Sequence, residues 1–212
     1  MWEIIQKGGI VMYPILLCSV LSIAIFLERL WSLRESKIIP KRFIKEVEEF
    51  IRMKKFNEAV ALCSTSNSSI ARIIYAGLKK AGKPKDEIKE AITEQGKQEA
   101  MELERFLNTL GTIAGVSPLL GLLGTVTGMI KTFNVLALSK QLGDPGMLSA
   151  GISEALITTA AGLIVAIPSF IFFKYFSSRV DKLIVRMEGI SIKFVELIEW
   201  HLKREKKIQV FQ

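Results

Sequence analysis

The chain has 212 residues, of which 50% are hydrophobic and 24% are charged, and 29 lysines and arginines against 21 acidic residues give a net charge of +8. This composition excludes an intrinsically disordered protein, and two cysteines in a chain of this length exclude a disulfide-stabilised scaffold. A positive charge is typical of nucleic-acid-binding proteins, but three long stretches without a charged residue indicate a lipid bilayer first, so we expect no nucleic-acid partner.

The first charge-free stretch, Ile10–Leu27, has 18 residues and as a helix would rise about 27 Å, which is just enough to cross a bilayer. Trp2 and Trp31 flank it, as aromatic residues do at membrane interfaces. A cleaved signal peptide would need a basic start and a small-residue cleavage site, which this segment lacks. We predict a retained transmembrane helix over 10–31 after a periplasmic N-terminus over 1–9, with a buried soluble helix as the alternative.

The next segment, residues 32–105, is rich in charge and is predicted to be helical throughout. Apolar residues at helical spacing predict four helices after Pro40, with breaks at the polar run 64–69 and at Gly82. The fourth helix begins after Pro84 with acidic residues in its first turn, and no strong break separates it from the second apolar stretch. The second transmembrane helix is therefore predicted to be the end of a long helix.

The second charge-free stretch, Phe106–Ile130, contains regularly spaced small residues. Its glycines are Gly111, Gly115, Gly121, Gly124 and Gly128. In water each would cost a helix about 1 kcal/mol relative to alanine, but in lipid small residues four apart let helices approach closely. A phosphate-binding loop is the alternative, and no Gly-Lys-Ser/Thr sequence supports it. We predict a transmembrane helix over 106–133, in which these glycines and Pro118 pack against neighbouring helices.

The third charge-free stretch, Ala155–Phe173, again has a spanning length of 19 residues. Pro168 leaves one backbone carbonyl without its helical partner, which is tolerable in lipid only if a neighbouring helix, hydroxyl or water satisfies it. Apolar residues keep helical spacing beyond the stretch. We predict a transmembrane helix over 152–174 that continues as a cytoplasmic helix over 175–212, and a periplasmic connection over 134–151.

The distribution of lysine and arginine predicts the orientation in the membrane. One basic residue precedes the first span, 17 lie between the first and second, two between the second and third, and nine after the third. Because positive residues stay on the cytoplasmic side, the N-terminus is predicted to be periplasmic and the C-terminus cytoplasmic. The fold class is thus an all-α membrane protein with three transmembrane helices, whose long second and third helices extend into a cytoplasmic helical domain.

Polar residues in and beside the last two spans are the candidates for chemistry. Glu154 stands directly before the third charge-free stretch, where it either marks an ion path or simply favours the helix dipole. Thr158 lies on the same face four residues later, Thr159 lies beside it, and Thr125 lies in the second span. Such hydroxyls can hold water and relay protons, or each can bond its own helix backbone. No catalytic set, cofactor motif or metal cluster is evident in the sequence, so we expect a protein that is not an enzyme.

A family resemblance rests on two segments: GVSPLLGLLGTVTGMIKTF at 115–133 and GISEALITTAAGLIVAIPSF at 151–170. They resemble the second and third membrane segments of the TolQ/ExbB proton-channel family. Glu28 and Arg29 after the first span and the three-span layout are similar too, so the likeness covers essentially the whole chain.

The resemblance implies a subunit of a motor in the bacterial inner membrane that is driven by the proton motive force. In that family a homopentamer encloses the single membrane helices of a TolR-like or ExbD-like partner dimer, and force passes to an envelope-spanning TolA-like or TonB-like protein. The family's pore glutamate matches Glu154, and its two threonines match Thr159 and Thr125. Helical geometry, however, places Thr159 about 140° around the helix from Glu154, whereas Thr158 shares its face, so the choice between the two threonines stays open.

One further alternative concerns the function itself, and the rest concern the type within the family. A passive membrane scaffold without ion conduction would use the same glycines for packing and would leave the threonines inert. Within the family, the lack of the extra N-terminal segment of some ExbB proteins favours a TolQ type, and three spans instead of four argue against the flagellar stators. The system that is energised depends on the partner.

Overall fold

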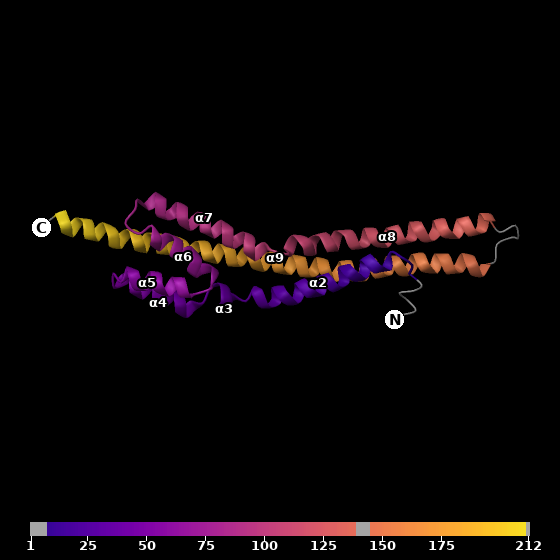
Figure 1. Cartoon of the computed structure of the whole chain (residues 1–212), viewed down its shortest axis with the longest axis horizontal. Helices are drawn as coiled ribbons and strands as arrows, with labels where there is room; N and C mark the ends of the chain where they lie inside the picture. The colour runs from indigo at the N-terminus through magenta and orange to yellow at the C-terminus, as the bar shows by residue number, and fades with distance from the viewer. Residues whose placement is uncertain (1–7, 139–144, 211–212) are drawn as a thin grey trace. The chain divides into compact units, whose positions relative to one another are not determined.

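The computed structural model describes residues 8–138 and 145–210, and the regular elements in these ranges are all α-helices (Figure 1). Three helical stretches are long and apolar enough to cross a membrane, and these are Met12–Ser32, Lys85–Asn134 and Ser149–Trp200. The predicted fold class, an all-α protein with three transmembrane helices, is confirmed. The described residues form two compact units, which we call the apolar unit (within 1–29 and 106–176) and the charged unit (within 30–105 and 177–212).

Three helices build the apolar unit: α2 (Met12–Ser32), α8 (Leu107–Leu138) and the first part of α9 (Pro145–Val210). Figure 1 shows α8 alongside the first part of α9. Both helices continue through their internal prolines, Pro118 and Pro168. Helix α8 continues to Leu138 and α9 begins at Pro145, so helices extend into both ends of the predicted connection over 134–151. Its central residues, 139–144, lie outside the described ranges.

Small residues line the contact between α8 and α9. On α8 the buried positions recur every three or four residues, as one helix face requires, and they include Leu107, Leu110, Ala114, Ser117, Gly121, Gly124 and Gly128. The matching buried positions on α9 include Ala155, Thr158, Gly162, Ala166 and Ser169. Because lipid provides no hydrophobic driving force, this contact depends on close backbone approach and van der Waals packing.

Helix α2 packs against α9 through a polar contact and an aromatic cluster. The hydroxyl oxygens of Ser22 and Ser169 lie 2.7 Å apart, and both residues are buried. Further along the two helices, the Phe26 ring lies 4.1 Å from the Phe172 ring and 5.7 Å from the Phe176 ring, centroid to centroid. Helix α9 therefore contacts both other helices of the apolar unit.

The outer faces of the apolar unit carry many exposed hydrophobic side chains. These include Leu17, Val20, Ile23, Leu119, Leu122, Ile164, Ile167 and Ile171. A contiguous apolar surface of this kind is untypical of a protein surrounded by water and indicates contact with lipid or with other subunits.

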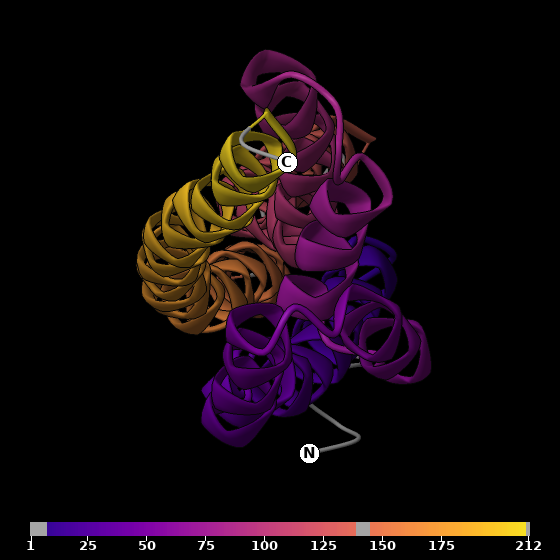
Figure 2. The same ribbon diagram turned by 90° about the vertical axis from the view of Figure 1, so that its left-hand side faces the viewer.

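The charged unit contains five further helices and the second part of α9. The helices are α3 (Glu35–Ile38), α4 (Lys41–Arg52), α5 (Phe56–Thr65), α6 (Ser69–Lys79) and α7 (Lys85–Glu104). Figure 2 looks onto this end of the chain, and neighbours in sequence from α4 to α7 pack against each other. Helix α6 is the most buried of them, and it approaches α7 so closely that a Cβ at Gly77 would lie 2.5 Å from the end of the Ile92 side chain.

Ion pairs connect the second part of α9 to other elements of the charged unit. Lys85 Nζ at the start of α7 lies 2.6 Å from a Glu199 carboxylate oxygen, and Arg186 Nη1 lies 2.5 Å from Glu35 Oε1. Arg179 Nε donates a hydrogen bond to the Leu33 carbonyl over 2.9 Å. Surface pairs of this kind contribute little to the stability of the fold.

The predicted long second helix is made of two helices joined at a short turn. Helix α7 ends at Glu104 and α8 begins at Leu107. Between them Arg105 is extended (φ −49°, ψ 140°) and Phe106 has φ +63°, a left-handed conformation that costs energy for a residue with a bulky side chain. No glycine or proline in the sequence marks this turn.

Candidate functional site

The candidate site lies along the contact between α8 and α9, which we call the α8–α9 seam. A Cβ at Gly124 would lie 2.2 Å from Thr158 Cγ2, and one at Gly121 would lie 3.1 Å from the Thr159 Cα. At Gly128 the distance to the Ala155 Cβ would be 3.3 Å. These three glycines therefore lie at points of close approach between the two helices.

The other glycines and prolines of interest have different surroundings. A Cβ at Gly111 would lie 3.3 Å from the Phe173 ring, which is a tight contact, whereas one at Gly115 would meet no atom within 4 Å. Pro118 is half-buried and Pro168 is exposed. Beside Pro168, the Ser169 hydroxyl donates to the Val165 carbonyl over 2.7 Å. Gly115 and Pro168 thus have free space beside them within this single chain.

The threonines differ in what their hydroxyls contact. Thr158 is completely buried (0% exposed), and its Oγ1 lies 2.8 Å from the Glu154 carbonyl oxygen and 3.0 Å from that of Gly8. Thr159 is half-buried and donates across the seam to the Gly121 carbonyl over 3.2 Å. Thr125 donates to its own helix, to the Leu122 carbonyl over 2.6 Å.

These contacts leave the threonine oxygens able to accept hydrogen bonds. Each hydroxyl uses its single proton on a carbonyl, so its oxygen lone pairs remain available to a water or an acid. Only a hydroxyl with accessible surface can use them, which applies to Thr125 and Thr159 and not to Thr158. Thr127 also bonds its own helix, with Oγ1 2.9 Å from the Leu123 carbonyl.

Glu154 forms an ion pair that sequence reasoning missed. Its Oε1 lies 2.8 Å from Lys131 Nζ on α8, and its side chain is 25% exposed. A signal for this pair exists in the sequence, because Lys131 is the first charged residue after one apolar stretch and Glu154 directly precedes the next. Two consecutive antiparallel helices bring such positions to the same level.

Arg29 lies at the other end of the apolar unit, and its burial and its partners were not predicted from the sequence. It is 3% exposed, pairs with Glu28, and its guanidinium carbon lies 5.3 Å from the centre of the Phe106 ring. A buried arginine needs such charge and aromatic partners. It therefore anchors the end of α2 beside the turn that precedes α8.

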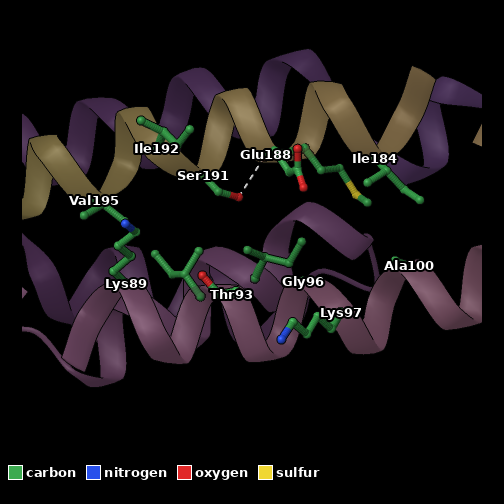
Figure 3. Close-up of a pocket in the computed structure, with 13 residues that line it drawn as sticks. Lys89, Thr93, Gly96, Lys97, Ala100, Ile184, Glu188, Ser191, Ile192 and Val195 are labelled. Carbon is green, nitrogen blue, oxygen red and sulfur yellow. Dashed lines mark hydrogen bonds between the residues drawn. The ribbon is translucent and has the colours of Figure 1, made fainter. Parts of the chain in front are cut away.

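A groove of about 330 Å³ lies in the charged unit between α7 and α9 (Figure 3). Its walls are mainly apolar, with Lys89 and Lys97 on α7 and Glu188 on α9. The Ser191 hydroxyl donates to the Met187 carbonyl over 2.7 Å. Among the described residues no group of three or more His, Cys, Asp or Glu side chains is placed to hold a metal ion.

Comparison with known proteins identifies the family. Residues 65–189, which include the α8–α9 seam, Lys131 and Glu154, match the model of the MotA/TolQ/ExbB proton channel family. The chain belongs to this family. The match covers α6, α7, α8 and the larger part of α9, so the MotA/TolQ/ExbB assignment does not rest on one motif.

Individual relatives support the assignment to the MotA/TolQ/ExbB family. The chain is 33% identical to the biopolymer transport protein ExbB-like 3 of Synechocystis sp., over 82% of this chain and 83% of that protein. It is 29% identical to the Tol-Pal system protein TolQ of Pseudomonas aeruginosa, over 93% and 92% of the two chains. With the biopolymer transport protein exbB1 of Vibrio cholerae it shares 26% identity, over 91% and 85%.

The family and the three apolar helices together describe a multi-pass protein of the inner membrane. Its family role is that of a transport component in an energy-transducing complex. The resemblance noted in the sequence is therefore confirmed at the level of the family.

Proposed function

We propose that this chain is the ring-forming subunit of a motor driven by the proton motive force. In this proposal a homopentamer encloses a dimer of a TolR-like or ExbD-like single-span partner and couples proton flow to an envelope-spanning TolA-like or TonB-like protein. The observation that carries the proposal is the α8–α9 seam. Thr159 on α9 donates a hydrogen bond there to the Gly121 carbonyl on α8, and Thr125 follows Gly121 by one turn of α8.

The accessible threonines are assigned the role of solvating the proton carrier. The oxygens of Thr125 and Thr159 accept hydrogen bonds from the partner's protonated carboxylic acid, while Glu154 handles proton entry. Thr158 is assigned to packing, because its buried hydroxyl has no surface to offer a partner. Each proton that crosses 100 mV releases about 2.3 kcal/mol, so several transfers are enough to bias a rearrangement of the ring.

The proposed orientation places the N-terminus in the periplasm and the C-terminus in the cytoplasm. Its support is the excess of lysine and arginine between the first two spans and after the third. The charged unit then lies in the cytoplasm, and the Glu154 end of the seam faces the periplasm, where protons enter.

The test is proton flux through vesicles that contain the full chain with its single-span partner. Thr159→Val removes one hydroxyl at constant volume and is expected to reduce flux about tenfold, because the partner's protonated acid loses a hydrogen-bond acceptor. Thr127→Val is the matched control, since Thr127 lies about 160° around α8 from Thr125, and it is expected to keep flux unchanged. Both variants are compared at equal amounts of assembled complex.

The rival function, a passive scaffold, makes the opposite prediction. It requires that Thr159→Val and Glu154→Gln leave both assembly and proton-driven work as in the unmodified chain. That result would contradict the proposed channel.

A further inference from the structure

We propose that Lys131 is the counter-ion that positions Glu154, an inference that rests on the proposed function. The lysine belongs to α8 and the glutamate to α9, 23 residues apart, and their Nζ and Oε1 atoms lie 2.8 Å apart. In the proton-conducting ring, Lys131 holds the carboxylate directed at α8 of its own protomer. It is a positioning residue that acts through Glu154.

The backbone geometry holds the two side chains in register. Lys131 follows Gly128 by three residues, and Glu154 precedes Ala155, so both flank a point of close helix approach. There a Cβ at Gly128 would lie 3.3 Å from both the Ala155 Cβ and the Gly151 carbonyl oxygen. Because the helix axes cannot separate without losing this contact, the lysine reaches the carboxylate in a defined geometry.

The chain before α2 closes the other side of the carboxylate. Gly9 has φ +67°, and a Cβ at that position would lie only 2.2 Å from Glu154 Oε1. The Gly8 carbonyl oxygen accepts a hydrogen bond from Thr158 Oγ1 over 3.0 Å, which holds this segment against the same turn of α9. Glu154 is therefore confined between Lys131 and Gly9.

This confinement decides in which direction Glu154 points. Its carboxylate contacts Lys131 at one level of α8, and the Thr159 hydroxyl contacts the Gly121 carbonyl at another. The Lys131 ammonium is the charged partner that holds the carboxylate in this direction.

The first test measures the ion pair directly and needs no transport. The full chain in membranes is treated with an amine-reactive reagent, and labelling of Lys131 is followed by mass spectrometry. Glu154→Gln is expected to increase the Lys131 labelling rate roughly threefold, because the charged carboxylate no longer holds the amine in an ion pair. Lys174, an exposed lysine that borders the same apolar stretch and lies 5.8 Å from the Phe170 and Phe173 ring centres, serves as the internal control.

The second test is a double-mutant cycle on proton flux in vesicles with the single-span partner. Lys131→Met is expected to reduce flux severalfold, and Lys131→Arg, which keeps the charge, to restore most of it. In the Glu154→Gln background Lys131→Met is expected to have no further effect, since the lysine acts through the glutamate. Lys174→Met controls for the loss of a positive charge beside a span.

The outcomes separate the two proposals. An unchanged Lys131 labelling rate in Glu154→Gln overturns the counter-ion role, whatever the flux. Flux losses that multiply in the double variant also overturn it, because they show that Lys131 acts on its own. If Glu154→Gln keeps full flux while Lys131 labelling rises, the ion pair stands as a structural contact, and both the proposed function and the role of Lys131 in proton transfer fail.

Discussion

At the scale of single residues, the best-defined polar contact of the charged unit joins Arg72 on α6 and Glu99 on α7. Arg72 Nε lies 2.6 Å from Glu99 Oε1, and the glutamate side chain is only 5% exposed. Burial alone would raise the pKa of the Glu99 carboxyl, but hydrogen bonds from Arg72, Ser69 and Gln95 and the charge of Arg72 outweigh it. The pKa therefore lies below its ordinary value of 4.5.

The Arg72–Glu99 pair predicts a pH dependence of stability. Because the folded state lowers the pKa of Glu99, the pair stabilises the fold above pH 4.5, and this contribution is lost as the pH falls through the folded value. The measurement is chemical unfolding of the full chain in detergent, followed by circular dichroism, from about pH 6 to about pH 3. Glu99→Gln is expected to lose less stability over this range than the unmodified chain.

Two outcomes bear on this prediction. Arg72→Met is expected to destabilise the charged unit by about 3 kcal/mol, because it leaves a buried carboxylate without its cation. Glu99→Gln costs less, since Arg72 is 44% exposed and water solvates it. Equal acid sensitivity of Glu99→Gln and the unmodified chain would show that other groups control the effect.

At the scale of secondary-structure elements, the α8–α9 seam depends on residues without side chains at defined positions. Gly124 and Gly115 are both in the middle of α8, and nothing in the sequence distinguishes the packing of one from that of the other. In the folded chain a Cβ would collide with Thr158 at Gly124 and would meet nothing at Gly115. Thr158 is β-branched and buried, so it cannot move aside easily.

This difference predicts unequal effects of the same substitution. Gly124→Ala is expected to destabilise the chain in detergent by about 1 to 3 kcal/mol through overpacking, whereas Gly115→Ala is expected to be neutral or slightly stabilising. Thermal unfolding of the two purified variants, followed by circular dichroism, measures both. If the two variants unfold at the same temperature, close packing at Gly124 does not stabilise the seam.

At the scale of the whole molecule, apolar and charged residues are separated into two units. The apolar unit exposes large hydrophobic side chains on α2, α8 and α9, and the lysines and arginines lie mostly in the charged unit. Because moving charged residues across a membrane is costly, this separation implies that the charged unit stays on one side. The proposed side is the cytoplasm.

The proposed orientation is testable with matched cysteine variants. Ser149 and Ser178 are both exposed on α9, before and after its apolar stretch. In a chain with Cys18 and Cys63 replaced, a membrane-impermeant maleimide is expected to label Ser149→Cys from the periplasm and Ser178→Cys only after the inner membrane is opened. The reverse pattern would invert the topology and would remove the assignment of proton entry to the Glu154 end.

Much of this protein follows from local features of the chain. The three spanning helices depend on the length of runs without charge, and the fold class and the family are recognisable from such runs and from the segments at 115–133 and 151–170. These properties need no knowledge of which helix contacts which. The turn at Phe106 was not predicted from the sequence, because it is formed without glycine or proline.

What the tertiary structure alone decided is how side chains pair across helices. Thr158 and Thr159 are neighbours in sequence, yet Thr158 is buried between Gly124 and Gly8, whereas Thr159 keeps accessible surface. Lys131 and Glu154 become partners only because α8 and α9 approach along a line of small residues. Local composition specifies that a helix crosses lipid, but the helix's rotation about its axis is set by packing against its neighbours.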